Sequence, residues 1–215
     1  NVVVSIPKTV VISTDIFDEF METHDLYKIA LRNDLSDEDI LKAFVEARLP
    51  STVLQDLYAF VSMVKGPIAV RSSSKLEDSH YQPFAGVYNT YMIPKIENDA
   101  KSTLRLLTEA IKSVYASVFF KASKAYMTAT SNVIDEEKMS VILQEVAGKT
   151  YEGKYYYPTI SGVGRSINFY PIYPETPEDS VVTIAYGLGK YIVDGAQALR
   201  FCPKYPKKTL QLSTP

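Results

Sequence analysis

The order of apolar and polar positions predicts a helical first part and a sheet in the second part. A β-branched run over residues 2–13 favours a strand, and segments with apolar residues at helical spacing follow it. The expected helices cover residues 15–24, 40–49, 53–64 and 98–126, and the last of these is the longest. After residue 135, short β-branched and aromatic runs separated by turn residues predict strands. We therefore expect an α+β fold.

Cap and turn residues mark several element ends. Ser36, with Asp39 three positions later, forms a near capping box before the second helix. Pro50 and Ser51 end that helix and open the next one, which stops at the Gly66 turn. These signals predict a helix boundary at each of these places.

The segment between residues 67 and 93 is predicted to be a strand, a long loop and a second strand. An apolar run, PIAVRSS, passes into a polar loop, and the chain returns through FAGVYNTYMI. At 215 residues and without internal repeats or a flexible linker, the chain suits one large domain or two packed subdomains. Because the pattern changes at residue 135, we expect subdomains at residues 1–135 and 136–215.

Composition and charge argue against two classes of partner, nucleic acids and membranes. The chain has 23 basic and 25 acidic side chains, which gives no broad positive field, so we expect no nucleic-acid partner. It has no apolar run of about 18 residues, so we expect no membrane partner. Cys202 is the single cysteine and cannot form an internal disulfide, which favours a cytoplasmic location. The start at Asn1, within a β-rich run, suggests a piece of a longer protein.

The segment VRSSSKLEDS carries the first candidate chemistry. Arg71 stands at a strand end, and three serines follow it. The guanidinium fork suits phosphate oxygens, and the loop could present hydroxyl and N–H groups to an anion. An exposed arginine beside a serine-rich turn explains the same pattern without any ligand.

Two further segments could either contact a ligand or have a purely structural role. Gly187, Gly189 and Gly195 follow a predicted strand, where they could let the backbone approach a nucleotide or could simply form turns. Gln144 and Glu145 end an apolar strand that could contact a ligand or just reach the surface.

The histidines and tyrosines have less specific interpretations. His24 and His80 have no second ligand or nucleophile at useful spacing, so we expect no metal site in this chain. The sixteen tyrosines could stack on sugars or pack in the core.

Taken in order, these segments resemble the ATP-binding domain of the phosphoenolpyruvate synthase and pyruvate phosphate dikinase family. That family has the motif R-S-S-x-x-x-E-D…F-A-G-x-x-x-T, followed by Q-x-M-V, S-G-V and G-L-G-E-x-x-V-x-G. This chain has VRSSSKLEDSHYQPFAGVYNT, LQEV, SGV and GLGKYIVDG in the same order. The residues that match the first motif are Arg71, Ser72, Ser73, Glu77, Asp78, Phe84, Ala85, Gly86 and Thr90. The segments IPKTVVISTDIFDEFM and AIKSVYASVFFKASKAY also resemble family segments, so the likeness covers most of the chain.

The resemblance implies an ATP-grasp-type domain of two subdomains with mixed or antiparallel sheets. It implies that Arg71 contacts the ATP phosphates and is the catalytic residue of this chain. The loop with Ser72, Ser73, Gly86 and Thr90 would close over the phosphates.

The resemblance also implies where the nucleoside lies. Gln144, Glu145 and Val146 would form a hinge strand, and the backbone of Glu145 and Val146 would bond adenine. Glycines of the second part would shape the neighbouring wall, namely Gly187, Gly189 and Gly195.

Several departures from the family pattern qualify these expectations. Lys190 stands where the family has glutamate, and Val146 stands where it has methionine. The family's lysine motif would lie before Asn1, and its Mg²⁺ ligands and final Q-x-R strand would lie beyond Pro215. No T-x-H-A-A motif is present, so a phosphohistidine domain and a pyruvate-binding domain are expected elsewhere in a longer protein.

The resemblance leads to one functional hypothesis and two alternatives. The chain would be the ATP-binding portion of a phosphoenolpyruvate synthase-like phosphotransferase, inactive by itself, in which ATP phosphorylates a histidine on a separate domain and the group passes to pyruvate. One alternative is a catalytically inactive nucleotide-sensing or interaction module of the same fold. The other is a tyrosine-rich binding domain, which requires exposed tyrosines.

Overall fold

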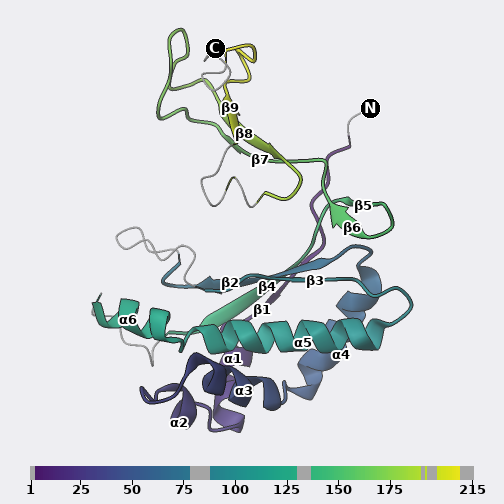
Figure 1. Cartoon of the computed structure of the whole chain (residues 1–215), viewed down its shortest axis with the longest axis vertical. Helices are drawn as coiled ribbons and strands as arrows, with labels where there is room; N and C mark the ends of the chain where they lie inside the picture. The colour runs from purple at the N-terminus through teal and green to yellow at the C-terminus, as the bar shows by residue number, and fades with distance from the viewer. Residues whose placement is uncertain (1–2, 78–87, 130–136, 190–191, 193–197, 209–215) are drawn as a thin grey trace. The chain divides into compact units, whose positions relative to one another are not determined.

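The computed structural model describes residues 3–77, 88–129, 137–189, 192 and 198–208. Helices and antiparallel sheets make it an α+β protein, as the sequence predicts (Figure 1). The chain divides into two compact units, Asn1–Val146 and Ala147–Pro215, and each is described by itself. The boundary expected at residue 135 concerns ATP-grasp subdomains and stays a prediction.

The first unit is a layer of helices against one face of an antiparallel sheet (Figure 1). The strand order is β1-β4-β2-β3. The strands are β1 (Thr9–Ile12), β2 (Ile68–Ser74), β3 (Tyr91–Ile93) and β4 (Met139–Glu145). The helices are α1 (Thr14–Thr23), α2 (Tyr27–Ala30), α3 (Asp37–Glu46), α4 (Ser51–Met63), α5 (Ala100–Ser117) and α6 (Lys121–Ala129).

An aromatic cluster forms the centre of the core between the helices and the sheet. Phe17 of α1 meets Tyr115 of α5 edge-on, with ring centroids 5.0 Å apart. Phe44 of α3 and Phe119 complete the cluster, and all four side chains are fully buried. Aromatic residues bury large apolar areas, so they explain much of the stability of this layer.

The predicted helix starts after Ser36 and at Ser51 are confirmed, whereas α3 ends at Glu46 and not at Pro50. The Ser36 hydroxyl accepts the Asp39 N–H at 3.1 Å, and the Ser36 N–H donates to the Asp39 carboxylate at 3.3 Å. This reciprocal capping box satisfies N–H groups that the helix leaves unpaired. Pro50 takes the N-cap position of α4, as expected.

The helix expected over residues 98–126 is instead two helices, because α5 ends at Ser117 and α6 begins at Lys121. Between them, Val118 and Phe119 donate their N–H groups to carbonyls three residues earlier. The Ser117 carbonyl accepts the hydroxyl of Ser123 at 2.7 Å. This break directs Phe119 into the aromatic cluster, a long-range packing requirement that helical periodicity alone does not reveal.

The second unit consists of strands, as predicted for the part after residue 135. β5 (Lys149–Tyr151) and β6 (Tyr155–Tyr157) form a hairpin. β7 (Ile160–Arg165), β8 (Val181–Tyr186) and β9 (Leu199–Phe201) form an antiparallel sheet in that order.

Candidate functional site

The first unit carries the serine-rich segment on a central strand of its sheet. β2 pairs with β4, which places Arg71 opposite Ile142 and Ser73 opposite Ser140. Val70 is fully buried against the helices. Because side chains alternate along a strand, its neighbour Arg71 points to the other face, and so does Ser73.

We call the sheet surface away from the helices the open face. By strand register, its members are Thr9, Val11, Ala69, Arg71, Ser73, Met92, Ser140, Ile142 and Gln144. Val11 is 60% exposed and Met92 is 55% exposed, although both are apolar. Val11 lies beside Ile142 of β4, whereas Met92 lies on β3 at the other edge of the sheet. Exposed apolar side chains mark a surface for a ligand or a partner. The open face therefore suits a flat apolar group next to an anion at Arg71.

Ser72 has a different role from Ser73. Its hydroxyl donates to one oxygen of the Glu77 carboxylate at 2.8 Å. The other oxygen of Glu77 accepts the N–H of Ser74 at 3.1 Å. Glu77 therefore closes the serine turn, and the Ser72 hydroxyl is engaged in this closure.

A buried carboxyl group lies beneath this turn. Glu137 is 5% exposed, and its Oε1 accepts the hydroxyl of Tyr88 at 3.3 Å. Burial disfavours the charged carboxylate and raises the pKa of Glu137. Burial and the nearby Glu137 charge likewise raise the pKa of Tyr88. The pair supports the turn from the core side.

The end of β4 is tied to two neighbouring segments. The Gln144 amide donates to the Thr9 hydroxyl at 3.1 Å. The Glu145 carboxylate accepts the N–H groups of Lys65 at 2.6 Å and Gly66 at 3.0 Å, and the Lys8 ammonium lies 3.2 Å away. Burial alone would raise the pKa of Glu145, but these three donors hold it below its ordinary value. The Glu145 side chain thus fixes the turn between α4 and β2.

The backbone N–H groups of the two residues expected at adenine are already paired. The N–H of Glu145 donates to the Lys8 carbonyl at 2.9 Å, and the N–H of Val146 donates to the Pro67 carbonyl at 2.8 Å. An adenine bound through these N–H groups would have to compete with both carbonyls.

Two of the predicted glycines lie just after β8. Gly187 has a φ of +76°, a conformation that glycine adopts without strain. Its N–H donates to the Thr159 carbonyl at 3.1 Å, and its carbonyl accepts the Ser161 hydroxyl at 2.5 Å. A Cβ at Gly189 would lie 3.4 Å from the Cβ of Ser161. Gly187 therefore meets a local turn requirement, whereas a side chain at Gly189 would make only an ordinary contact with Ser161.

The predicted residues fall into four groups. Strands β2 and β4 and the residue after β4 carry Arg71, Ser72, Ser73, Gln144, Glu145 and Val146, of which Arg71, Ser73 and Gln144 lie on the open face. Thr90 is exposed and directly precedes β3, which pairs with β2. Gly187 and Gly189 belong to the second unit, and Gly86 and Gly195 lie outside the described residues, as do Asp78, Phe84 and Ala85.

The sequence interpretation missed Val11 and Met92 as members of the open face. Both lie on short strands, and alternation within each strand does not specify which face the helices cover. Their side is known only from the pairing of Val11 with Ile142 and of Met92 with Ala69.

Two features are absent from the described residues. No three His, Cys, Asp or Glu side chains in those residues are grouped so that they could hold a metal ion. Among the helices of the described part, none is long and apolar enough to cross a membrane.

Comparison with known proteins identifies the family. The model of the pyruvate phosphate dikinase AMP/ATP-binding domain matches residues 1–202. The chain is 26% identical over 192 residues to an uncharacterized phosphotransferase, YvkC, of Bacillus subtilis, covering 88% of this chain and 20% of that protein. It is 25% identical over 169 residues to a phosphoenolpyruvate synthase of Aeropyrum pernix, covering 74% of this chain and 18% of that protein. The chain thus spans about a fifth of the length of these relatives. It belongs to the pyruvate phosphate dikinase AMP/ATP-binding domain family.

Proposed function

We propose that this chain is the ATP-binding portion of a phosphoenolpyruvate synthase-like phosphotransferase of the ATP-grasp type. ATP donates a phosphoryl group to a histidine on a separate domain of the parent protein, and a pyruvate-binding domain receives it from there. The observation that carries the proposal is the open face, where β2 with Arg71 and Ser73 is flanked by β4, which carries Ile142, and by β3, which carries the exposed Met92. Family membership supports the nucleotide as the ligand.

Arg71 is the proposed phosphate contact and the catalytic residue of the chain. Its guanidinium presents a fork that fits two phosphate oxygens. Ser73 lies two residues further along the same face and offers a hydroxyl donor. Ser72, Gly86 and Thr90 complete the proposed phosphate loop, with Ser72 acting through its backbone because its hydroxyl donates to Glu77. Such groups position the phosphates and neutralise charge during phosphoryl transfer.

The apolar part of the open face is the proposed support for adenine. Val11 of β1 and Ile142 of β4 are paired neighbours and offer an apolar surface, and Met92 of β3 adds an exposed apolar side chain at the other edge of the sheet. In the proposal, Gln144, Glu145 and Val146 form the edge that the base contacts, and Gln144 does so with a side chain already on this face. Three glycines of the second unit are proposed to line the nucleotide as well, namely Gly187, Gly189 and Gly195.

The family resemblance also implies Mg²⁺ as the companion of ATP. The described residues do not fit a Mg²⁺ site, because they contain no suitable cluster of acidic side chains. We therefore assign no Mg²⁺ ligand to them.

Replacing Arg71 tests the proposed site directly. ATP is titrated calorimetrically into the wild-type chain, R71Q and the control R105Q, which loses an exposed arginine paired with Glu109 on α5. Charge-assisted hydrogen bonds contribute about 1.5–3 kcal/mol, so R71Q should bind ATP about 10- to 100-fold more weakly. Equal affinities of R71Q and R105Q would remove Arg71 from the site.

One sequence feature favours the second candidate function, a catalytically inactive nucleotide-sensing or interaction module. Lys190 reverses the charge that the family's G-L-G-E motif places there. Incubation of the parent protein with radiolabelled ATP separates the two functions. Labelled phosphohistidine supports the phosphotransferase, whereas ATP binding without any label on protein supports the sensor.

A further inference from the structure

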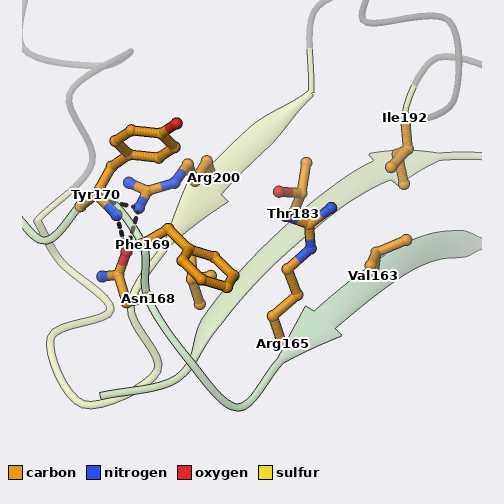
Figure 2. A pocket seen from close by; sticks show the side chains of 9 residues that line it. Val163, Arg165, Asn168, Phe169, Tyr170, Thr183, Ile192 and Arg200 are labelled. Carbon is orange, nitrogen blue, oxygen red and sulfur yellow. Dashed lines mark hydrogen bonds between the residues drawn. The ribbon is translucent and has the colours of Figure 1, made fainter. Parts of the chain in front are cut away.

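In each unit, a buried polar side chain holds a loop in place. In the second unit this side chain is Asn168, which is fully buried next to a cavity of about 470 Å³ lined by Arg165 and Arg200 (Figure 2). Its Oδ1 accepts Nη2 of Arg200 at 2.7 Å, and its amide donates to Glu175 at 2.7 Å. An asparagine amide does not ionise, so this support does not depend on a charge of Asn168.

The first unit uses an ionisable side chain in the same role. Glu137 lies two residues before β4, and β4 begins at Met139, the residue that pairs with Ser74. Glu137, its hydrogen-bond partner Tyr88 and Ser74 are all buried. The Ser74 hydroxyl has no hydrogen-bond partner within the part of the chain that the structure describes. Three buried polar groups thus meet at the end of β2, where the serine turn begins.

The surroundings of Glu137 oppose its ionisation. Burial disfavours the carboxylate most strongly and raises the pKa of Glu137, and the charge of Glu77 acts in the same direction. The polar groups of Ser74, Tyr88 and Leu76 act in the opposite direction without reversing the shift. The neutral acid can donate its proton to the Ser74 hydroxyl, which is near and is not otherwise engaged.

The neighbouring cation does not neutralise this carboxyl group. Lys138 follows Glu137 in the chain, but its ammonium pairs with Asp18 of α1. The charged group of the turn that acts on Glu137 is the Glu77 carboxylate, which has the same sign. Ionised Glu137 therefore adds a second negative charge to the turn that follows Arg71, and like charges at short distance repel.

We propose that Glu137 and Tyr88 are positioning residues of the phosphate turn and that loss of the Glu137 proton weakens ATP binding. The proposal rests on the proposed function of the open face. While Glu137 is neutral, the end of β2 keeps the shape that presents Arg71. When the proton leaves to solvent, the new carboxylate repels Glu77, loosens the turn and disfavours the phosphates of ATP. The pair thus makes ATP affinity sensitive to pH.

E137Q tests this role, because glutamine keeps the shape and an oxygen acceptor for Tyr88 but cannot ionise. ATP is titrated calorimetrically into the whole wild-type chain, E137Q and the exposed control E22Q at pH 5 and pH 8. Wild type and E137Q should bind equally at pH 5. At pH 8, wild type should bind about fivefold more weakly, the effect of one like charge at short distance in water. ATP also loses protons in this range, but the ratio of the two affinities at each pH removes that effect, and E22Q should match wild type throughout.

Y88F separates positioning from a general loss of stability. The Tyr88 hydroxyl lowers the pKa of Glu137, so Y88F should move the fall in ATP affinity to higher pH. A purely structural role would instead weaken binding equally at every pH, and that result would overturn the coupling of Tyr88 to Glu137.

The turn is also followed without ATP, through the amide NMR signals of Ser73 and Ser74 between pH 5 and pH 8. Wild type should show a transition that E137Q lacks. The same transition in both proteins, or an affinity ratio that stays constant between pH 5 and pH 8, would overturn the role of Glu137. Absence of ATP binding at every pH would overturn the proposed function of the open face, whereas the ATP-free signals would still decide whether Glu137 controls the turn.

Discussion

Ser72 and Ser73 are neighbours in the sequence, but they face opposite sides of β2. The hydroxyl of Ser72 belongs to the closed turn with Glu77, whereas Ser73 shares the open face with Arg71. A serine-rich motif thus combines one residue that builds the loop with one that can meet a ligand. The distinction rests on alternation along the strand, which assigns the two side chains to different faces.

This distinction predicts opposite effects of two similar substitutions. S72A removes a hydrogen bond to a carboxylate and should lower the free energy of unfolding by about 1–3 kcal/mol, with little change in ATP affinity. S73A should leave stability nearly unchanged and weaken ATP binding several-fold. Urea unfolding measures the stability of both variants, and calorimetric titration measures their ATP affinity. If S72A and S73A had the same profile, the assignment of their faces would be wrong.

Glu137 gives stability a pH dependence with a defined sign. Its pKa is raised by burial, so the folded chain holds the proton at pH values where the unfolded chain has already released it. Stability should therefore decrease as pH rises from the ordinary glutamate value of 4.5 through the raised value. E137Q cannot ionise, so its melting temperature should exceed that of wild type at pH 8, and the difference should shrink near pH 4. The control E22Q changes an exposed glutamate on α1. If E22Q raised the melting temperature at pH 8 as much as E137Q does, this role of Glu137 would be refuted.

At the scale of elements, local sequence signals predict where helices begin. Long-range packing determines the break between α5 and α6 and the composition of the open face. The capping residues around α3 and the proline before α4 act within one turn of the chain, so the sequence contains them completely. The break between α5 and α6 depends on where Phe119 must pack, which is set by Phe17 and Phe44 from distant segments. The open face depends in the same way on strand register, which fixes Val11 and Met92 only after the sheet has formed.

The capping box at α3 provides a test at this scale. S36A removes both side-chain bonds of Ser36 and should lower the free energy of unfolding by about 1 kcal/mol. S51A, at the exposed first position of α4, is the matched control and should change little. Denaturant unfolding of both variants gives the comparison, and equal stability of S36A and wild type would show that the box adds nothing.

For the whole molecule, family membership identifies the class of ligand, and the geometry of the open face indicates which residues could contact it. The family establishes an AMP/ATP-binding domain that matches residues 1–202. The open face of the first unit explains how the residues of the family-like motif could meet a nucleotide. The cavity of the second unit was not predicted, because Arg165 and Arg200 lie on separate strands and come together only through their pairing with β8.

The central claim is that ATP binds on the open face of the first unit. The most direct measurement follows the amide NMR signals of β2 and β4 in the whole chain during an ATP titration, with R71Q in parallel. We predict saturable shifts at Arg71, Ser73, Ile142 and Gln144 in wild type, and much weaker shifts at the same signals in R71Q. Shifts confined to the helices, or equal shifts in wild type and R71Q, would contradict the claim.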